Sequence, residues 1–541
     1  MKPATDPVKH FRRLIRARMA LLWVVSGEER RAEKSMADAA AREGCTVIFW
    51  DVAMGASDLE GSPVELEAFQ NPVAVIEQIR SGQDKRAAGN PEGHHHPELW
   101  ILRDLPELWA NSPELVRLLK STARVLQDEP DPAKFITLAI LTTAGPEAIP
   151  PSLKGETTVV DWPLPSRLEL QAILDDVVAK SGTPAPKERD KTAILEAAAG
   201  LPSVDAENAF ALSLVKHKHV NPGEVARVKK EIVDRVTGLE WHEPDPRGLR
   251  GIAGLGNLKT WLREREIAFS PEAAKLTVPM PKLRGVLLIG PSGTGKSLTA
   301  KCCATAFGVP LVRLDLGALK DKWVGSSERN VREAFKRLIA IRRAVVWCDE
   351  IEKAVAGSRS LGDGGVGGDQ FGALLTFLED VADDPETQLF FAATCNDPSR
   401  LQPELLSRFD EAFMLDLPTA AERAGVLSLS LESYSYKPGE FKLDPVAAVT
   451  EGFSGRELHK LVGAGMWRAL GDGKRAVKAA DLVACARETK PVSVAAAEQV
   501  DALRRWCAGR TRPASEPEIP SKLSLAAGPG GRTVQTGGEA L

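Results

Sequence analysis

The sequence of 541 residues lacks three features that would place it in familiar classes. Its seven cysteines form no CxxC pair and mostly lie in apolar runs, so we expect reduced core thiols rather than a disulfide framework. No apolar run approaches the roughly 18 residues that a membrane span needs. No HExxH motif is present, which disfavours a zinc metalloprotease. The chain is long enough for several domains, and 43% hydrophobic and 27% charged residues are typical of a globular protein.

The chain also lacks a net positive charge, because 70 lysines and arginines stand against 74 aspartates and glutamates, which gives −4. Such a balance disfavours nucleic acid or an anionic membrane as a partner. One basic run, "HFRRLIRARM", is the only support for nucleic-acid binding, and a solvated helix face explains it equally well. The apolar "ALLWVV" that follows is too short for a signal-sequence core and is better explained as a first strand. We therefore expect a cytoplasmic protein without a membrane.

Two stretches of the sequence alternate strand-like and helix-like patterns. The first has strand-like runs at Ala20–Val25, Thr46–Trp50, Leu99–Leu102 and Phe135–Leu141, which predicts a parallel sheet with crossover helices. We expect five parts: an α/β domain at 1–180, a helical segment and linker at 181–240, a second α/β domain at 241–418, a helical portion at 419–490, and a C-terminal helix with a disordered tail at 491–541.

A phosphate-binding motif follows the first strand of the second stretch. The pattern GxxxxGK[ST] lies between the strand-like run Val286–Ile289 and a helix-compatible segment, a context that a chance glycine turn does not explain. We expect Lys296 to reach the β- and γ-phosphates of ATP and the Ser297 hydroxyl to bind Mg²⁺. The predicted nucleotide-binding residues of the loop are Gly290, Pro291, Ser292, Gly293, Thr294, Gly295, Lys296, Ser297 and Leu298.

Polar residues end the next two apolar strands. "RAVVWCDEIEKA" ends in Asp349, which fits the Mg²⁺–water shell, and Glu350, which fits polarising the attacking water. "LFFAATCND" ends at Asn396, whose amide would fix that water or contact the γ-phosphate. The alternatives are a solvated acidic pair that caps the next helix and a turn-forming Asn-Asp.

These motifs, with "PELLSRFDEAF" and "GFSGREL", come in the order and spacing of AAA+ ATPases, which the chain resembles over roughly residues 249–490. The resemblance implies a P-loop NTPase sheet with a helical lid and a homo-oligomer, a hexamer. It makes Arg408 the finger that enters a neighbouring subunit's site, Arg456 the sensor-2 arginine, and Ile252 and Ala253 the segment against adenine. A surface ion pair is the alternative for either arginine.

The chain departs from the family pattern in two places. "LLSRFD" is shorter than the family's "LLRPGRFD"-like stretch and keeps one arginine, which puts the efficiency of subunit coupling in doubt. In addition, members of the protein-remodelling AAA subgroup often have a residue other than arginine at the position of Arg456.

A tryptophan stands in the polar segment "LKDKWVGSSERN". Leaving about 150 Å² of its ring in water forgoes roughly 4 kcal/mol. Lys322, Trp323, Val324 and Gly325 resemble the loop that protein-remodelling AAA proteins direct into the channel of their ring. There Trp323 would grip an extended polypeptide client. The alternative is that Trp323 folds back onto its own domain.

The first α/β stretch parallels the second. "ALLWVVSGEERRAEKSMADAA" has Glu28 and Glu29 where phosphates would lie, and "LWILRDLPELW" has Leu105 in place of the catalytic glutamate. We infer a degenerate AAA-like domain that cannot hydrolyse ATP; an unrelated α/β domain is the alternative. The two-part arrangement resembles uncharacterised AAA ATPases encoded in algal plastid and cyanobacterial genomes.

Three functions are compatible with these patterns. The first is an ATP-hydrolysing, ring-forming remodeller or unfoldase of protein clients. The second is an ATP-dependent assembly switch or scaffold that threads nothing. The third is a nucleic-acid-acting AAA+ protein, which the acidic balance disfavours.

Overall fold

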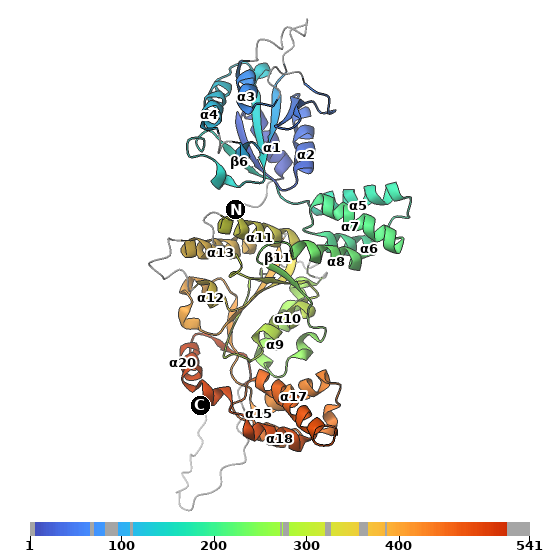
Figure 1. Ribbon diagram of the computed structural model, residues 1–541, viewed down its shortest axis with the longest axis vertical. Helices are drawn as coiled ribbons and strands as arrows, with labels where there is room; N and C mark the ends of the chain where they lie inside the picture. Colours follow the sequence, from blue (N-terminus) through green and yellow to red (C-terminus); the bar gives the residue numbers. More distant parts are fainter. Residues whose placement is uncertain are drawn as a thin grey trace, which may run out of the picture.

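The computed structural model arranges the chain as four units, two built on sheets and two built from helices, with three of them in a row and the first helical unit to one side (Figure 1). The first sheet unit lies at the top of Figure 1, a four-helix unit lies to its side, the second sheet unit follows below, and a second helical unit lies at the lower end. The structure describes residues 6–64, 70–81, 96–108, 112–270, 273, 281–319, 326–355, 366–384 and 387–516.

The first sheet has six strands among the described residues, in the order β3-β2-β4-β5-β1-β6. β3 pairs antiparallel with β2, and the other neighbours are parallel. The strands are β1 (Leu21–Val25), β2 (Thr46–Asp51), β3 (Gly55–Ser57), β4 (Glu98–Arg103), β5 (Ile136–Thr142) and β6 (Thr158–Asp161). The helices are α1 (Pro7–Arg16), α2 (Glu29–Ala41), α3 (Pro72–Ser81) and α4 (Pro113–Gln127).

Alternating side chains of these strands fill two cores, one on each face of the sheet. In β1, Trp23 packs with α3 and α4, whereas Leu22 and Val24 pack with α1 and α2. This alternation follows from the two-residue period of a strand, and it explains why a buried parallel strand is apolar throughout.

The second sheet has seven strands within the described part of the chain, in the order β13-β12-β8-β11-β10-β9-β7. β7 pairs antiparallel with β9, and the other neighbours are parallel. The strands are β7 (Leu239–His242), β8 (Gly285–Ile289), β9 (Leu311–Leu314), β10 (Arg343–Cys348), β11 (Gln388–Cys395), β12 (Glu411–Met414) and β13 (Arg512–Pro513). The helices of this unit are α9 (Gly256–Glu266), α10 (Lys296–Phe307), α11 (Ser326–Ile341), α12 (Ile351–Val355), α13 (Val366–Asp383), α14 (Pro403–Leu406), α19 (Val492–Ala495) and α20 (Ala497–Cys507).

The two sheets share one topology. The order β6-β1-β5-β4-β2 in the first unit and β12-β8-β11-β10-β9 in the second both run fifth, first, fourth, third, second along the chain. Because this order requires the same set of crossovers, the fold predicted from sequence, a P-loop-type sheet preceded by an AAA-like α/β domain, is confirmed.

Each sheet unit is followed by four helices with their own apolar core. The first set is α5 (Arg167–Ser181), α6 (Glu188–Ala198), α7 (Ser203–His217) and α8 (Pro222–Val233), and the second is α15 (Ala420–Ser433), α16 (Asp444–Val449), α17 (Gly455–Gly471) and α18 (Ala479–Glu488). We call the second set the lid. Both sets open with a capping box, Ser166 with Glu169 and Thr419 with Glu422.

Two expected boundaries differ from the structure. The first helical unit begins with α5 at Arg167 rather than at residue 181, because α5 packs against α7 and shares its core. The segment expected as a helix and tail from 491 forms α19 and α20 and then adds β13 to the edge of the sheet. Residues 517–541 of that segment lie outside the described residues.

Two further features of the described chain are the state of its cysteines and the character of its helices. All seven cysteines lie in described residues and are free, and six of them are buried. In the described ranges, no helix combines the length and the apolar character needed to cross a membrane.

Candidate functional site

The phosphate-binding motif forms the connection between β8 and α10. The strand is fully buried, and Gly293 and Gly295 have φ values of 87° and 96°, in the left-handed region that favours glycine. A Cβ atom at Gly293 would lie 2.9 Å from the Cβ of Arg456. The loop therefore touches the lid through bare backbone.

Lys296, the first residue of α10, is buried beneath this loop. Its Nζ donates to the backbone oxygens of Gly290 and Pro291, each at 2.8 Å. Burial lowers the pKa of Lys296 to about 8, and the nearby charge of Arg456 adds to the lowering. The ammonium is held in the concave side of the loop, where phosphate oxygens would replace the two carbonyl groups.

At the end of β10 a carboxylate meets two hydroxyl groups. Ser297 Oγ donates to Asp349 Oδ1 at 3.2 Å, and Thr394 Oγ1 donates to the same oxygen at 2.7 Å. Carboxylate and hydroxyl oxygens are the ligands that Mg²⁺ prefers. Ser297 and Asp349 therefore fit the ion that the sequence predicts for them.

Glu350 and Asn396 meet beside this pair. Asn396 Nδ2 donates to Glu350 Oε1 at 2.9 Å, and Lys353 forms an ion pair with the other carboxylate oxygen. Glu350 has a φ of 50°, a conformation that costs a non-glycine residue on the order of 1–3 kcal/mol. Both contacts hold the carboxylate where the carboxyl ends of β10 and β11 lie side by side.

The lid reaches the loop with the N-terminal end of α17. The backbone N–H of Arg456 donates to Gly293 O at 3.0 Å, and Ser454 and Glu457 form the capping box of this helix. The arginine predicted for sensor 2 is thus anchored at the phosphate loop by its own backbone.

The segment predicted to contact adenine lies between the second sheet unit and the lid. Ile252 is buried, and its carbonyl oxygen accepts a hydrogen bond from Lys259 Nζ at 2.5 Å. Ala253 faces α15, since a Cβ at Gly425 would lie 3.1 Å from the Cβ of Ala253. Any ring held here would contact both units at once.

Two predicted sites lie apart from this cluster. Arg408 contacts α13, where its Nη2 lies 3.3 Å from Glu379 Oε2, and its Nε is buried with no hydrogen-bond partner in the described part of the chain. The loop residues Lys322, Trp323 and Val324 lie outside the described residues.

Known families match the chain in three successive segments. The ATPase family associated with various cellular activities (AAA) matches residues 286–417, which include the phosphate loop, Asp349, Glu350 and Asn396. Residues 286–417 are an AAA ATPase domain. The N-terminal domain of SpoVK-like AAA ATPases matches residues 7–162, and the second domain of the same proteins matches residues 168–235. These matches coincide with the first sheet unit and the first helical unit.

Relatives extend the likeness over the whole chain. The uncharacterized AAA domain-containing protein ycf46 of Guillardia theta is 28% identical over 94% of this chain and 96% of that protein, and that of Pyropia yezoensis is 28% identical over 93% and 98%. The ATP-dependent zinc metalloprotease FtsH of Methylibium petroleiphilum is 33% identical over 43% of this chain and 37% of its own length. Among solved structures, the FIGL-1 AAA domain matches with a TM-score of 0.42 and 23% identity, covering 52% of this chain and 94% of that one.

Sequence reasoning missed two residues of the AAA domain's site. Thr394 donates to Asp349 and accepts the backbone N–H of Glu350 at 2.9 Å, so it holds both acids at the end of β10. Glu352 accepts the backbone N–H of Asn396 at 2.9 Å. The available signal was position alone, since Thr394 lies near the end of β11, two residues before Asn396, and Glu352 follows Glu350 by two residues.

In the first unit, the place that corresponds to the phosphate loop is filled by its own side chains. β1 is followed by Ser26, Gly27 and Glu28, and the Glu28 carboxylate pairs with Arg31 and accepts the N–H of Ser203, the first residue of α7. The start of α7 thus meets Glu28 as the start of α17 meets Gly293 in the AAA domain. A helix N-terminus attracts anions, and the anion here belongs to the chain.

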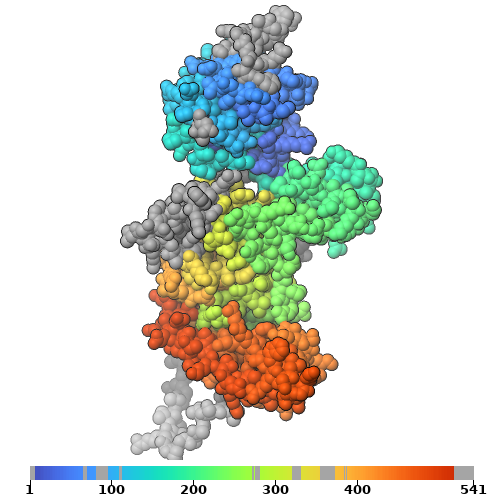
Figure 2. All heavy atoms as spheres, in the orientation of Figure 1, coloured from blue at the N-terminus to red at the C-terminus, as the bar shows by residue number. Residues whose placement is uncertain are grey.

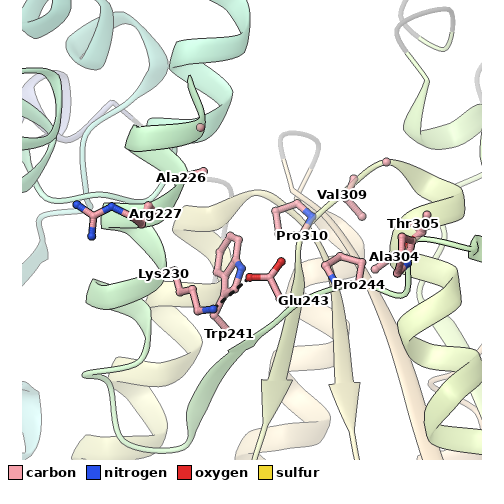
Figure 3. Close-up of a pocket in the computed structure, with 13 residues that line it drawn as sticks. Ala226, Arg227, Lys230, Trp241, Glu243, Pro244, Ala304, Thr305, Val309 and Pro310 are labelled. Atoms are coloured by element: carbon pink, nitrogen blue, oxygen red, sulfur yellow. Dashed lines mark hydrogen bonds and ion pairs between the residues drawn. The ribbon is translucent and has the colours of Figure 1, made fainter. Parts of the chain in front are cut away.

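A separate hollow of about 660 Å³ lies between α8, β7 and the end of α10 farthest from the phosphate loop (Figure 3). Figure 3 shows Lys230 and Glu243 beside the ring of Trp241, with the pair 3.1 Å apart, while Arg227 points away from them. The hollow marks the junction between the first helical unit and the AAA domain.

Proposed function

We propose that the AAA domain binds ATP with Mg²⁺ and hydrolyses it. The observation that carries the proposal is that Lys296, Asp349 and Glu350 stand at the carboxyl ends of β8 and β10, two parallel strands separated only by β11, whose own end bears Asn396. AAA ATPase domains generally hydrolyse ATP. The ion, when bound, neutralises charge that develops on the phosphates.

The roles of the side chains follow from their places. Lys296 exchanges two backbone carbonyls for phosphate oxygens, Glu350 accepts a proton from the attacking water, and Asn396 orients that carboxylate and the water. Turnover requires Glu350 to leave its ion pair with Lys353, because a carboxylate with both oxygens occupied is a poor base.

Hydrolysis in this scheme depends on assembly. Among the described residues, Arg408 pairs with the exposed carboxylate of Glu379, a contact that contributes little stability. A neighbouring copy would receive this guanidinium at its phosphates, while Arg456 would act from the lid of the same chain. The proposed assembly is a ring of identical subunits, a hexamer.

We further propose that the ring remodels or unfolds protein clients. The chain is related to FtsH, fidgetin-like and SpoVK-like AAA proteins, and Lys322-Trp323-Val324 would grip an extended client without regard to its sequence. The first two units, which we infer not to hydrolyse ATP, would select the protein clients.

The Glu350→Gln variant tests the ATPase proposal. It should bind ATP as tightly as the original chain but hydrolyse it at least about a hundredfold more slowly, since the amide cannot accept the proton. The measurements are steady-state phosphate release, binding of a fluorescent ATP analogue, and assembly by light scattering. Unchanged turnover would remove Glu350 from the site, and no ATP binding by the original chain would end the proposal.

A second candidate is an ATP-dependent assembly switch that threads nothing, favoured by the single arginine in "LLSRFD". Trp323→Ala discriminates the two: a remodeller should keep its basal ATPase rate and lose processing of an unfolded model client. Trp467→Ala, which removes a tryptophan that is 76% exposed on the lid, is the matched control. Full client processing by Trp323→Ala would exclude Trp323 as the gripping residue, and an original chain that processes no client would favour the switch.

A further inference from the structure

Glu352 carries a buried carboxyl group that the proposed mechanism does not use. It lies in α12, two residues after Glu350, and only 4% of its surface is exposed. An acidic residue in the first turn of a helix is ordinarily solvated, and burying a carboxylate costs several kcal/mol unless partners compensate it. Such a placement at the edge of an active site calls for a specific role.

The contacts of Glu352 lead to the end of β11 and not to its own helix. Its Oε1 accepts the backbone N–H of Asn396 at 2.9 Å, while its Oε2 is buried without a nitrogen or oxygen donor among the described residues, and the Cys395 thiol faces the same carboxyl group. The side chain of Asn396 in turn donates to Glu350 Oε1 at 2.9 Å. Glu352 thus holds the backbone of Asn396, and the side chain of Asn396 holds Glu350. These two hydrogen bonds link the start of α12 to the end of β11.

These hydrogen bonds can fix the position of the Asn396 side chain. The backbone of Asn396 follows the last residue of β11 and has lost its strand partners, so the Glu352 carboxylate fixes where the residue sits. The Asn396 amide can then reach the catalytic carboxylate and the water only from that place. A displacement of about 1 Å in such a group can cost about a hundredfold in rate.

We propose that Glu352 is a positioning residue for ATP hydrolysis, acting through the backbone of Asn396 to place its side-chain amide on Glu350. The inference rests on the proposed ATPase function. It assigns Glu352 no contact with nucleotide, so it should affect the catalytic step and leave nucleotide binding unchanged.

The test is a double-mutant cycle on the full chain. Glu352→Ala should lower kcat at least about tenfold with KM for ATP within about twofold, and Glu352→Gln, which keeps an acceptor oxygen, should restore kcat to within about threefold. In an Asn396→Ala background the Glu352→Ala change should cost less than about threefold, because the group it positions is gone. Glu404→Ala, at an exposed carboxylate of α14, is the control and should leave kcat unchanged.

Several results would overturn the inference. Equal costs of Glu352→Ala in the two backgrounds, a change confined to KM, or a Glu352→Gln variant as slow as Glu352→Ala would each do so. If Glu352→Ala lacks a cooperative thermal transition, Glu352→Asp replaces it in the cycle, since it keeps the charge and shortens the reach. An original chain that does not hydrolyse ATP would instead refute the proposed function, which keeps the two failures distinct.

Discussion

Two buried lysines show how differently one residue type is used in this chain. Lys296 is buried against the carbonyl oxygens of the phosphate loop, whereas Lys229 of α8 is buried with its Nζ 5.9 Å from the centre of the Trp241 ring. Burial lowers the pKa of Lys229 to about 7. Lys296 lies where phosphate oxygens would bind. Burial of the Lys229 ammonium group instead lowers the stability of the folded chain, which unfolding measurements would reveal.

We predict that Lys229→Met raises the thermal unfolding midpoint at pH 7. The folded-state pKa is depressed, so the folded chain resists protonation: the cost is fully present below about pH 7 and fades as pH rises toward the unfolded value near 10.5. The gain should be on the order of 2 kcal/mol at pH 7 and should shrink steadily toward pH 10. Differential scanning fluorimetry across this range measures it.

The neighbouring lysine provides the control for that experiment. Lys230 is part-exposed and pairs with Glu243, so Lys230→Met should change the free energy of unfolding by no more than about 0.5 kcal/mol at any pH in the range. A gain for Lys229→Met that is constant with pH would show that packing, and not charge, is responsible.

Among the elements, β13 has an influence beyond its two residues. It pairs with β12, and Ala514 after it is fully buried, with its N–H bonded to Met414 O at 2.9 Å and its carbonyl accepting from Leu258 N at 3.1 Å. Ser515 Oγ donates to Glu422 Oε1, the atom that also accepts the N–H of Leu255. The strand therefore connects the sheet, the adenine segment and the lid.

We predict that ending the chain at Arg510 weakens nucleotide binding as well as stability. Loss of β13 and its hydrogen bonds frees Glu422 and the segment that precedes α9, so the Kd for a fluorescent ATP analogue should rise at least about tenfold. A chain ending at Glu516 keeps every one of these contacts and is the control. Equal affinity in the two chains would confine the role of β13 to the sheet edge.

How far the sequence predicts each element depends on where its stabilisation comes from. The runs at residues 20–25, 46–50, 99–102 and 135–141 all form strands, because a buried parallel strand needs continuous apolar residues. The edge strands β3, β6, β7 and β13 were not predicted, since two to four residues have no periodicity and take their order from the neighbouring strand.

The same reasoning applies to the site. Lys296, Asp349, Glu350 and Asn396 stand at strand and helix ends, where one-dimensional spacing fixes three-dimensional position, and the structure brings them together. Thr394 and Glu352 act through contacts between segments about 45 residues apart, which no spacing rule encodes. Roles that require a second subunit, such as that of Arg408, stay predictions.

At the scale of the whole molecule, the first two units are joined to the AAA domain through contacts with α11. This helix begins at Ser326, shortly after the Lys322-Trp323-Val324 segment. Figure 1 shows α11 at the top of the second sheet unit, facing the first, and Figure 2 shows the first helical unit projecting to one side of both. Lys336 pairs with Asp161 at 2.8 Å, Arg332 pairs with Glu147, and Arg337 donates to Gly200 O at 3.1 Å. Three contacts on one helix join the units.

We predict that Gly200→Ala separates the first two units from α11. Gly200 has a φ of 84°, and its Cβ would lie 2.8 Å from Ile341 N and 2.9 Å from Ala340 O, backbone atoms that cannot move aside. Hydrogen exchange of α11 should accelerate at least about tenfold while the ATPase rate stays within about twofold.

Gly182→Ala is the matched control for this change. Gly182 has a φ of 67°, so an alanine there meets the same backbone strain, but no atom lies within 4 Å of its Cβ. If both variants alter α11 equally, backbone strain and not the lost contact explains the effect.

The carboxylate of Glu28 at the start of α7 has a consequence for how this helix end meets anions in solution. Because this anion is covalently part of the protein, its concentration at the start of α7 does not vary. A free phosphate would have to displace it, so the place that corresponds to the phosphate loop stays occupied by the chain itself.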